Sequence, residues 1–401
     1  MSIQLGGVVM NIPNDWKVKR LEKLVQFGSG GTPSKANKSY WQGDIPWISA
    51  STMHQQELIS SDLFISKAGL AAGSKLAKEN DLLLLVRGSM LWKKIPICLC
   101  KRDVAFNQDV KSLSVNKSIQ ANYLLYWFLA HQRFLLNKVV GTGIGAGKLD
   151  FDALKSLDIL LPPLPEQKAV VDLLSIWDKA IEKTERLIHA KEKRFKGLMH
   201  ELINDNGQLT TRKLGWKKVK LGDLFRNDII VEKGKALTKM DISKGSIPVV
   251  AGGQTYPYYT NIATHEMPTV TVSASGAYAG FIWFHDYPIW ASDCNVLFVV
   301  NGDTKFLFFA LKSIQERVYA LQSGGAQPHV YSKDMKSLTI SWPSAEERQL
   351  IAETLSAAQH EIDILKQLQE KYKTQKCGLM QKMLTGAWRV KPEIVNQYMG
   401  A

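Results

Sequence analysis

The chain contains two copies of one segment, 181 residues apart, and this duplication limits its possible folds more than any other feature. Residues 155–203 and 336–384 align without a gap, with 13 identities over 49 positions. Both copies open on Lys-Ser-Leu and carry a Gly-Leu-Met triplet near their ends. Self-similarity at a fixed spacing indicates two structural units of the same kind.

Each copy continues as a predicted helix with an apolar residue at every seventh position. Prolines at 162, 163 and 165 end the preceding strand and suit the first turn of a helix that begins near Glu166. A helix of about 38 residues is roughly 57 Å long. Its apolar positions are Leu174, Ile181, Ile188, Phe195 and Leu202 in the first copy and Ile351, Ala358, Leu365, Tyr372 and Leu379 in the second. This spacing is typical of a coiled-coil seam, so we predict that the helices pack as an antiparallel pair.

The similarity continues more weakly through the lobe that precedes each helix. Trp16 is matched by Trp216, and the Ile-Pro pair at 45–46 is matched by the pair at 247–248. The helices have kept their sequence pattern while the lobes have diverged. We therefore predict that the helices are a shared scaffold and that the lobes bind different targets. The alternative is a duplication whose lobes drifted without selection.

Short apolar runs between turn residues predict strands in both lobes. We expect strands at 44–50, 81–87 and 110–115 in lobe one, and at 247–250, 269–273, 281–284 and 296–300 in lobe two. A helix should follow the last strand of each lobe, at 122–134 and at 304–321. Each lobe is therefore expected to be a mixed α/β domain.

The predicted fold class is α+β. Two mixed α/β domains are joined by two long helices that form an antiparallel coiled coil, with a pseudo-twofold internal repeat. The expected division of the chain is a first recognition domain at 1–157, a first spacer helix at 158–207, a second recognition domain at 208–338, and a second spacer helix with a C-terminal tail at 339–401.

The charge of the chain suggests a polyanionic partner. With 51 Lys and Arg against 37 Asp and Glu, the net charge is +14, which favours nucleic acid over most other partners. Residues 166–203 and 346–384 together carry only +1, so +13 lies on the lobes and tails. A nucleic-acid surface is thus expected on the lobes.

Other features exclude a membrane or secreted protein. The longest aliphatic run, at 82–86, is far shorter than the roughly 20 residues that span a bilayer. The N-terminal residues lack the pattern of a secretory signal. The cysteines at 98, 100, 294 and 377 offer no CxxC pair and no zinc-finger spacing. We expect a cytoplasmic protein with reduced thiols and no membrane partner.

Polar, basic and aromatic loops between the strands are the candidate DNA contacts. Glycines let the backbone approach phosphates, Lys and Arg neutralise them, and Asn, Gln, Ser and Arg can read base edges. Arg87, Gln254 and Gln327 are the candidates for base reading. The predicted DNA-binding residues are Lys35, Arg87, Lys93, Lys94 and Lys148 in lobe one, and Gln254, Tyr256, Ser275, Tyr278, Gln327, His329 and Lys333 in lobe two. For any single tyrosine, packing within its loop is the better interpretation.

Catalytic and nucleotide-binding motifs are not found. The loop at 141–148 has glycines before a lysine, but Thr142 and Leu149 depart from the phosphate-binding loop pattern. The histidines have no ligand spacing, and no amino-methyltransferase or nuclease motif occurs. A DNA-binding chain without catalysis is therefore favoured. Two alternatives are a self-contained DNA-modifying enzyme and a scaffold that binds DNA without sequence preference.

The duplicated plan resembles the DNA-specificity subunit of type I restriction-modification systems. The residues that carry the resemblance are Gly30-Gly31-Thr32-Pro33-Ser34, Tyr40-Trp41, Asp44-Ile45-Pro46-Trp47-Ile48, Asn107-Gln108-Asp109-Val110, Leu161-Pro162-Pro163-Leu164-Pro165-Glu166-Gln167, Gly378-Leu379-Met380 and Leu384-Thr385-Gly386. In the second copy, Trp342-Pro343-Ser344-Ala345-Glu346-Glu347-Arg348 keeps only one proline of the Leu-Pro-Pro-Leu-Pro-Glu-Gln motif.

The resemblance implies a non-catalytic subunit with two target-recognition domains, each reading one half of a bipartite site in double-stranded DNA. The helical pair would set the gap between the half-sites, and unlike lobes imply two different half-sequences. Two modification subunits would methylate the DNA and would carry S-adenosylmethionine, so that no cofactor is expected on this chain. Motor-nuclease restriction subunits would cleave it.

Overall fold

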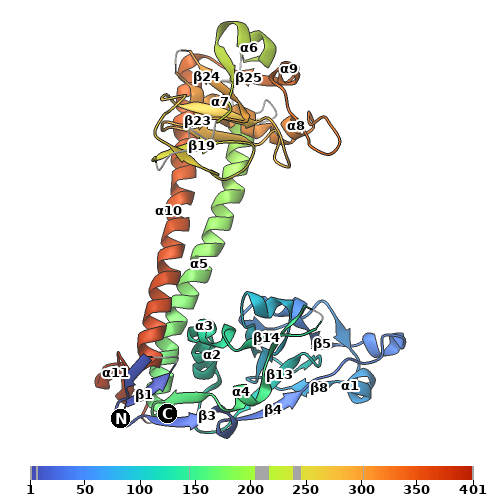
Figure 1. The fold of residues 1–401 in the computed structure, drawn as a ribbon, viewed down its shortest axis with the longest axis vertical. Coiled ribbons are helices and arrows are strands. Elements are labelled where there is room, and N and C mark those ends of the chain that lie inside the picture. Colours follow the sequence, from blue (N-terminus) through green and yellow to red (C-terminus); the bar gives the residue numbers. More distant parts are fainter. Residues whose placement is uncertain are drawn as a thin grey trace. The chain divides into compact units, whose positions relative to one another are not determined.

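The computed structural model describes residues 2–5, 8–143, 145–203, 216–237, 245–300 and 302–399. These residues belong to two compact units (Figure 1). Unit 1 combines residues 1–183 with 369–401, and unit 2 comprises 184–368. Each unit contains one lobe and part of each long helix. The predicted domain boundaries at 157, 207 and 338 remain predictions, and the one at 207 lies outside the described residues.

The two long helices have equal length and equivalent places in the repeat. α5 spans Leu164–Ile203 and α10 spans Ala345–Leu384, 40 residues each. Both ends of α10 therefore follow the corresponding ends of α5 by the spacing of the repeat. The loss of two prolines in the second copy does not move the start of its helix. Both predicted starts are confirmed to within two residues.

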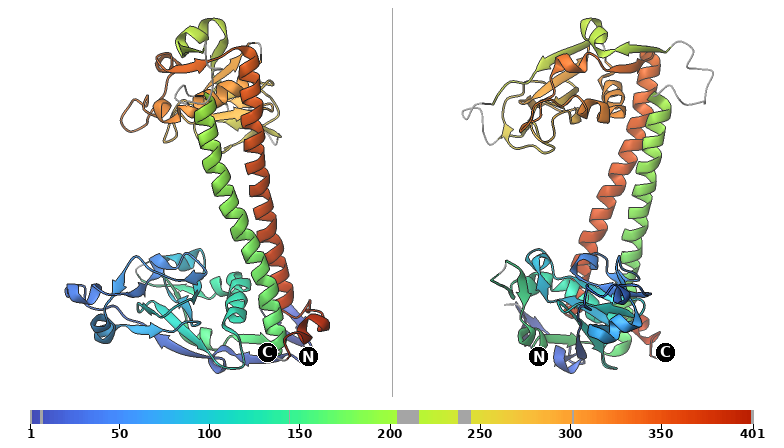
Figure 2. Two further views of the ribbon diagram at one scale, coloured as in Figure 1. Left: turned by 180° about the vertical axis from the view of Figure 1, so that it is seen from behind. Right: turned by 90° about the vertical axis from the view of Figure 1, so that its right-hand side faces the viewer.

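Within each unit the helices pack side by side and antiparallel (Figures 1 and 2). In unit 2, Lys191 Nζ of α5 lies 2.7 Å from Glu361 Oε1 of α10, and Ile203 at the end of α5 shares an apolar cluster with Ile351 near the start of α10. In unit 1, Lys376 of α10 forms an ion pair with Asp178 of α5. These contacts confirm the predicted antiparallel pairing.

The predicted seam is the buried side of the helix pair. All ten of its residues are buried or half-buried, and Leu174 is fully buried. Leu355 and Ile362, on the adjoining positions of α10, are also buried. A helix with one narrow apolar stripe is unstable alone in water, because most helical stability comes from packing that stripe.

A tryptophan at the start of each lobe bonds to a glutamate at the start of the helix that follows. Trp16 Nε1 donates to Glu166 Oε2 at 3.1 Å, and Trp216 Nε1 donates to Glu347 Oε1 at 3.2 Å. A two-stranded sheet accompanies each bond: β3 (Lys17–Arg20) with β16 (Asp158–Leu161), and β17 (Lys217–Lys220) with β25 (Thr339–Trp342). The recurrence of Trp and Glu in both copies therefore has a structural cause.

The next helical residue bonds to the same carbonyl group in both copies, although the residue differs. Gln167 Nε2 donates to the carbonyl of Pro162 at 2.9 Å, and Arg348 Nη1 donates to that of Pro343 at 2.8 Å. Gln167 also bonds to the backbone of the loop before the lobe helix. Arg348 instead bonds to Asp303, at the start of the equivalent lobe helix, at 3.1 Å.

Lobe one is a mixed α/β domain with two main sheets. Their strand orders are β4-β13-β9-β11-β6 and β7-β5-β12-β8. The strands are β4 (Val25–Ser29), β5 (Ile45–Ile48), β6 (Glu57–Leu58), β7 (Phe64–Ile65), β8 (Lys75–Ala77), β9 (Leu82–Leu85), β11 (Ile97–Cys100), β12 (Val104–Phe106) and β13 (Val110–Val115). The helices are α1 (Lys67–Gly73), α2 (Ala121–Ala130), α3 (Gln132–Leu136) and α4 (Phe151–Lys155). A hairpin of β1 (Ser2–Leu5) and β2 (Val8–Asn11) precedes the lobe.

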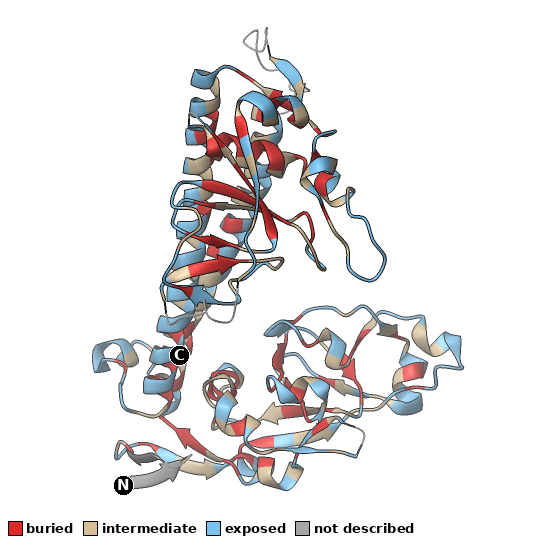
Figure 3. Ribbon diagram, turned by 45° about the horizontal axis from the view of Figure 1, so that its top comes forward, coloured by how far each residue is buried: buried red, intermediate tan, exposed pale blue. Residues whose placement is uncertain are grey.

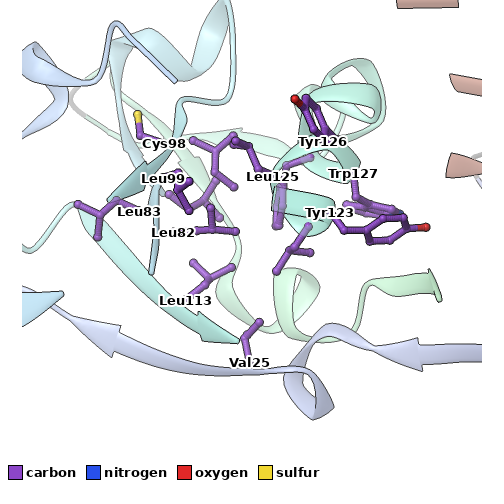
Figure 4. Packing of buried hydrophobic residues seen from close by; sticks show 14 of the residues in the cluster. Val25, Leu82, Leu83, Cys98, Leu99, Leu113, Tyr123, Leu125, Tyr126 and Trp127 are labelled. Atoms are coloured by element: carbon purple, nitrogen blue, oxygen red, sulfur yellow. The ribbon is translucent and has the colours of Figure 1, made fainter. Parts of the chain in front are cut away.

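The core of lobe one lies between its larger sheet and α2. Figure 4 shows Leu125 of α2 beside Leu99 and Leu82 of the sheet. These strands are apolar along their length, and Leu82–Leu85 are all fully buried. Figure 3 shows the same concentration of buried residues in the strands.

Lobe two repeats this topology with fewer strands. Its sheets have the orders β18-β24-β21-β22 and β20-β19-β23. The parallel pair β19–β23 corresponds to β5–β12, which confirms the predicted match of the Ile-Pro pairs. The elements are β18 (Ile229–Lys233), β19 (Ile247–Val250), β20 (Tyr259–Thr260), β21 (Thr269–Ser273), β22 (Ile282–His285), β23 (Trp290–Ala291), β24 (Cys294–Val299), α6 (Leu221–Asn227), α7 (Thr304–Ser313), α8 (Gln315–Tyr319) and α9 (Ser332–Met335).

The single helix predicted after the last strand of each lobe is wrong in detail, because each is two helices. The breaks fall at His131 and Ile314, where the backbone leaves helical geometry. In both lobes a glutamine follows the break and bonds to the backbone at or just before the start of a strand of the larger sheet. The Gln132 side chain accepts from the backbone N–H of Ile95 and donates to its carbonyl. The Gln315 side chain accepts from Ile282 N and donates to the carbonyl of Gly280. The apolar pattern is continuous, so this tertiary contact is invisible to periodicity.

The C-terminal tail, with α11 (Pro392–Asn396), is held to the N-terminal part of unit 1 by Arg389. Its guanidinium donates to Asp15 and to Glu166, with nitrogen–oxygen distances of 2.6–2.9 Å. The Glu166 side chain is 2% exposed, so the tail neutralises a buried carboxylate. The same hydrogen bonds hold the pKa of Asp15 below its usual range.

None of the helices in the described part of the chain is both long enough and apolar enough to cross a membrane.

A buried ion pair in the helix seam of unit 1 generates the first prediction. The Lys376 side chain is 9% exposed and pairs with Asp178, which also accepts from Tyr126 Oη at 2.7 Å. Replacing Asp178 with Ala would leave the lysine buried without its partner, and should lower the free energy of unfolding by about 3 kcal/mol in urea titration. The control is Glu370→Gln, which removes an exposed pair and should cost less than about 1 kcal/mol. Equal losses would contradict the prediction.

A buried histidine in β22 of lobe two generates the second prediction. Burial lowers the pKa of His285 to about 4, against roughly 6.5 in the unfolded chain. Below pH 6.5 the unfolded state binds a proton that the folded state does not, so stability falls as the pH falls. Between pH 7 and pH 5 the free energy of unfolding should drop by about 2 kcal/mol from this group. His285→Asn should remove that component in urea titrations at both pH values, whereas His54→Asn, at an exposed loop, should retain it.

Candidate DNA interface

A small sheet in lobe one brings two predicted DNA contacts together. The predicted strand 81–87 ends early, and Arg87 belongs to a separate strand β10 (Arg87–Gly88). β10 pairs with β15 (Gly147–Leu149), which forms a hairpin with β14 (Val139–Gly141). Arg87 and Lys148 face each other across this pairing, and both are exposed. Residues 141–148 thus lie between two paired strands, whereas the nucleotide-binding P-loop lies between a strand and a helix; Ile144 lies outside the described residues.

Glycines make this local structure possible. Gly88 has φ 149° and ψ 164°, a region open essentially only to glycine. Gly147 is buried, and a Cβ atom there would lie 2.9 Å from Val139 Cγ1 and 3.0 Å from Leu91 Cβ. Close packing of the hairpin on the segment after β10 therefore depends on glycine.

The basic turn after β10 adds two more predicted contacts and one residue that sequence reasoning missed. Lys93 and Lys94 follow the short 3₁₀ helix Ser89–Trp92, and both are exposed. Trp92 is 51% exposed, and its Nε1 donates to the carbonyl of Gly145 at 3.0 Å. The presence of a tryptophan between cations was the available signal. The exposure of Trp92 was not predictable, because tryptophan side chains are on average largely buried.

Lys35 does not belong to this hairpin. It is exposed on the loop between β4 and the 3₁₀ helix Lys38–Trp41. That loop is held by a hydrogen bond of 2.7 Å from Thr32 to the Gln108 side chain. The Asn107 side chain accepts from Asp109 N at 3.2 Å, so it caps the turn before β13.

Two loops of lobe two are joined by backbone pairing. His329 pairs with Ser275 and with Ser323, and Gly276 N donates to the carbonyl of Pro328 at 3.0 Å. This brings together three of the predicted contacts: Ser275, Gln327 and His329. Gln327 is exposed, whereas the Ser275 hydroxyl already donates to the carboxylate of Asp293.

The other predicted contacts of lobe two differ in their surroundings. Gln254 is exposed, on a loop held to Ser273 through a hydrogen bond of 3.0 Å to Gly252 O. Tyr278 is 46% exposed. Lys333 is exposed and its Nζ lies 5.4 Å from the centre of the Tyr331 ring.

Tyr256 has a clear packing role. Its ring stacks on Trp283 with a centroid distance of 4.6 Å and an interplanar angle of 11°. Its hydroxyl bonds to that of Tyr287, and burial raises the pKa of Tyr256 well above its usual value. These contacts agree with packing as the better interpretation of a single loop tyrosine. The contact of Tyr256 with DNA, like those of the other residues named above, stays a prediction.

Among the described residues, no group of three or more His, Cys, Asp or Glu side chains is arranged to hold a metal ion. The candidate loops of the two lobes expose cations, amides, hydroxyls and aromatic rings. Such groups can contact phosphates and base edges.

The fold and these loops define a duplicated protein with two α/β recognition lobes on a helical pair. The family described as "Type I restriction modification DNA specificity domain" matches residues 13–191 and 213–373. The chain belongs to this family, so the resemblance seen in the sequence is confirmed.

Relatives and solved structures agree. The chain is 25% identical over 418 aligned positions to the "Type I restriction enzyme MjaVIII specificity subunit" of Methanocaldococcus jannaschii, covering 95% of each chain. It is 31% identical over 166 positions to the EcoR124I/EcoR124II specificity subunit of Escherichia coli, covering 41% of each. The crystal structure of a type I S subunit from M. genitalium has the same fold, with a TM-score of 0.64 at 17% identity, covering 93% of this chain and 97% of that one.

The cations of lobe one generate the third prediction. Lys148→Ala should weaken binding to all DNA duplexes alike and reduce the slope of log affinity against log salt by about 1, because one phosphate contact is lost. Fluorescence anisotropy with labelled duplexes between 50 and 200 mM salt measures both. Lys371→Ala, an exposed lysine of α10, is the matched control and should leave the slope unchanged. An unchanged slope for Lys148→Ala would show that this lysine does not contact DNA.

Proposed function

We infer that this chain is the sequence-specific DNA-binding specificity subunit of a type I restriction-modification complex, without catalytic activity of its own. The observation that carries the inference is the duplication itself: two lobes of one topology present different loops, and the family matches both halves of the chain. A protein that reads two DNA segments needs such a pair of lobes. A protein that performs one reaction does not.

The loops support an asymmetric bipartite target. Lobe one presents a basic hairpin with Arg87 and Lys148, whereas lobe two presents Gln254, Gln327 and His329 on paired loops. Arginine pairs best with guanine and glutamine with adenine in the major groove. Lobes that differ in these side chains select different half-sequences in double-stranded DNA.

The outer face of α10 supports partner subunits. Leu350 and Ile364 are 62% and 49% exposed, with exposed Ala357 midway between them. These three residues are spaced by seven, so they form a second apolar stripe apart from the seam. We propose that two modification subunits bind the helical pair, bring S-adenosylmethionine and methylate the DNA. Motor-nuclease restriction subunits complete the complex, in the cytoplasm.

The decisive experiment is co-expression with the modification subunit in a host without adenine methylation, followed by genome-wide mapping of methylated adenines. The expected result is one bipartite motif with two different half-sequences, and co-purification of the modification subunit. A symmetric motif would contradict the reading by unlike lobes. Methyl transfer by the purified chain alone from labelled S-adenosylmethionine would favour a self-contained DNA-modifying enzyme. Equal footprint protection of all sequences would favour a non-specific scaffold.

The helical pair supplies the fourth prediction. Seven residues inserted after Lys183 and seven after Leu368 preserve the seam, and both points lie where the two compact units divide. Each insertion adds roughly 10 Å of helix, so the gap in the methylated motif should lengthen by about 3 base pairs while both half-sequences stay the same. The control is a seven-residue extension after Ala401. An unchanged gap would show that helix length does not set the spacing.

A further inference from the structure

Lobe one carries an apolar surface inside its most basic patch. Segments 87–94 and 138–148 contain Arg87, Lys93, Lys94, Lys138 and Lys148 and no acidic residue. Within the described residues, the ion pairs of the protein leave all five cations without an acidic partner. In their midst Trp92 is 51% exposed and Val140 is 53% exposed. Val140 and Trp92 lie on opposite faces of β14, because the indole ring rests against Gly141, the next residue along the strand. The exposed indole ring among cations without acidic partners is therefore the feature that indicates a contact surface.

Trp92 is positioned by the hairpin rather than mobile. Its only polar atom, Nε1, donates to Gly145 O at the hairpin turn. A Cβ atom added at Gly141 would lie 3.8 Å from the far edge of the indole ring, so the ring rests on that glycine. Because the N–H is already used, the indole can offer a ligand only its apolar surface.

The neighbours of Trp92 favour one groove of DNA. β14, which is labelled in Figure 1, forms a three-stranded sheet with β15 and β10. The indole ring of Trp92 rests on the face of β14 that carries Gly141, and Lys148 pairs with Arg87 on the other face. Cations around the ring would reach the phosphates that flank a groove, and the thymine methyl group is the apolar feature that the major groove exposes.

We propose that Trp92 reads the major groove for lobe one and packs its indole ring on a thymine methyl group of the half-site. Trp92 is thus a specificity-determining residue that adds affinity independent of salt, while the lysines around it add affinity independent of sequence. This proposal rests on the proposed function, since it requires a half-site read by lobe one. A half-site with a methylated adenine contains the thymine that pairs with it.

The test uses the full chain with its modification subunits, the duplex found by methylation mapping, and the same duplex with deoxyuridine for each thymine of one half-site. Uracil lacks only the methyl group. Wild-type protein should bind the uracil duplex about tenfold more weakly for one of the two half-sites. Trp92→Ala should bind the thymine duplex about tenfold more weakly than wild type does. It should bind the uracil duplex no more weakly than the thymine duplex, and its slope of log affinity against log salt should equal that of wild type. Such non-additivity identifies the pair of groups that touch.

Two further variants separate contact from folding. Trp92→Phe keeps an aromatic ring but loses the bond to Gly145, so it should retain most of the affinity if the ring contacts DNA, and behave like Trp92→Ala if the residue only holds the hairpin. Trp388→Ala is the matched control, because Trp388 is 53% exposed with Lys382 Nζ 3.9 Å from its ring centre. It should bind like wild type.

Several results would overturn the proposal. If wild type and Trp92→Ala lost affinity by the same factor when uracil replaced thymine, a contact between Trp92 and the methyl group would be excluded. Loss of the modification subunit with unchanged DNA affinity would make Trp92 a protein contact instead. In both cases wild type still binds the mapped site, so the proposed function would stand. If wild type shows no preference for that site, the proposed function fails instead.

Discussion

Burial of one narrow apolar stripe on each long helix is the constraint on which the rest of the structure depends. Neither helix can hide its stripe alone, and the lobes are attached at the helix starts. The stripe therefore needs the second copy of the repeat. Polar groups within the seam fix where the helices meet: Lys376 is buried against Asp178, and a shift along the helices would leave it without a partner. An ion pair of this kind contributes specificity of register more than stability.

Each lobe is joined to the helix that follows it by the same small set of bonds. The tryptophan–glutamate bond is retained in both copies, at 3.1 and 3.2 Å. The neighbouring position has changed from Gln167 to Arg348, yet both side chains reach the equivalent proline carbonyl. The requirement is a donor of sufficient length at that place, not a particular residue. This leaves the outer loops of the lobes free to diverge, because none of these bonds involves them.

Much of this organisation could be predicted from the residues. The duplication, the helix limits, and the strands at 110–115, 247–250 and 269–273 followed from pattern alone, and the family followed from the resemblance of its motifs. The breaks at His131 and Ile314 did not, because the apolar periodicity runs through them and only the glutamine contact to a distant strand explains them. The candidate DNA interface could also be predicted only in part. The types of residue in its loops were predictable, but the residues that the fold brings next to them were not.

The alternation of two lobes with two helices could be inferred from the residues, because a repeat and a seven-residue period can be recognised along the chain. Which loop residues lie together became clear only from the folded protein. Arg87 and Lys148 are 61 positions apart, yet face each other because β10 pairs with β15. Trp92 is exposed because its N–H is held by the turn of that hairpin. Hydrogen bonds between distant strands leave no periodic trace in the chain, so these groupings could be read only from the folded protein.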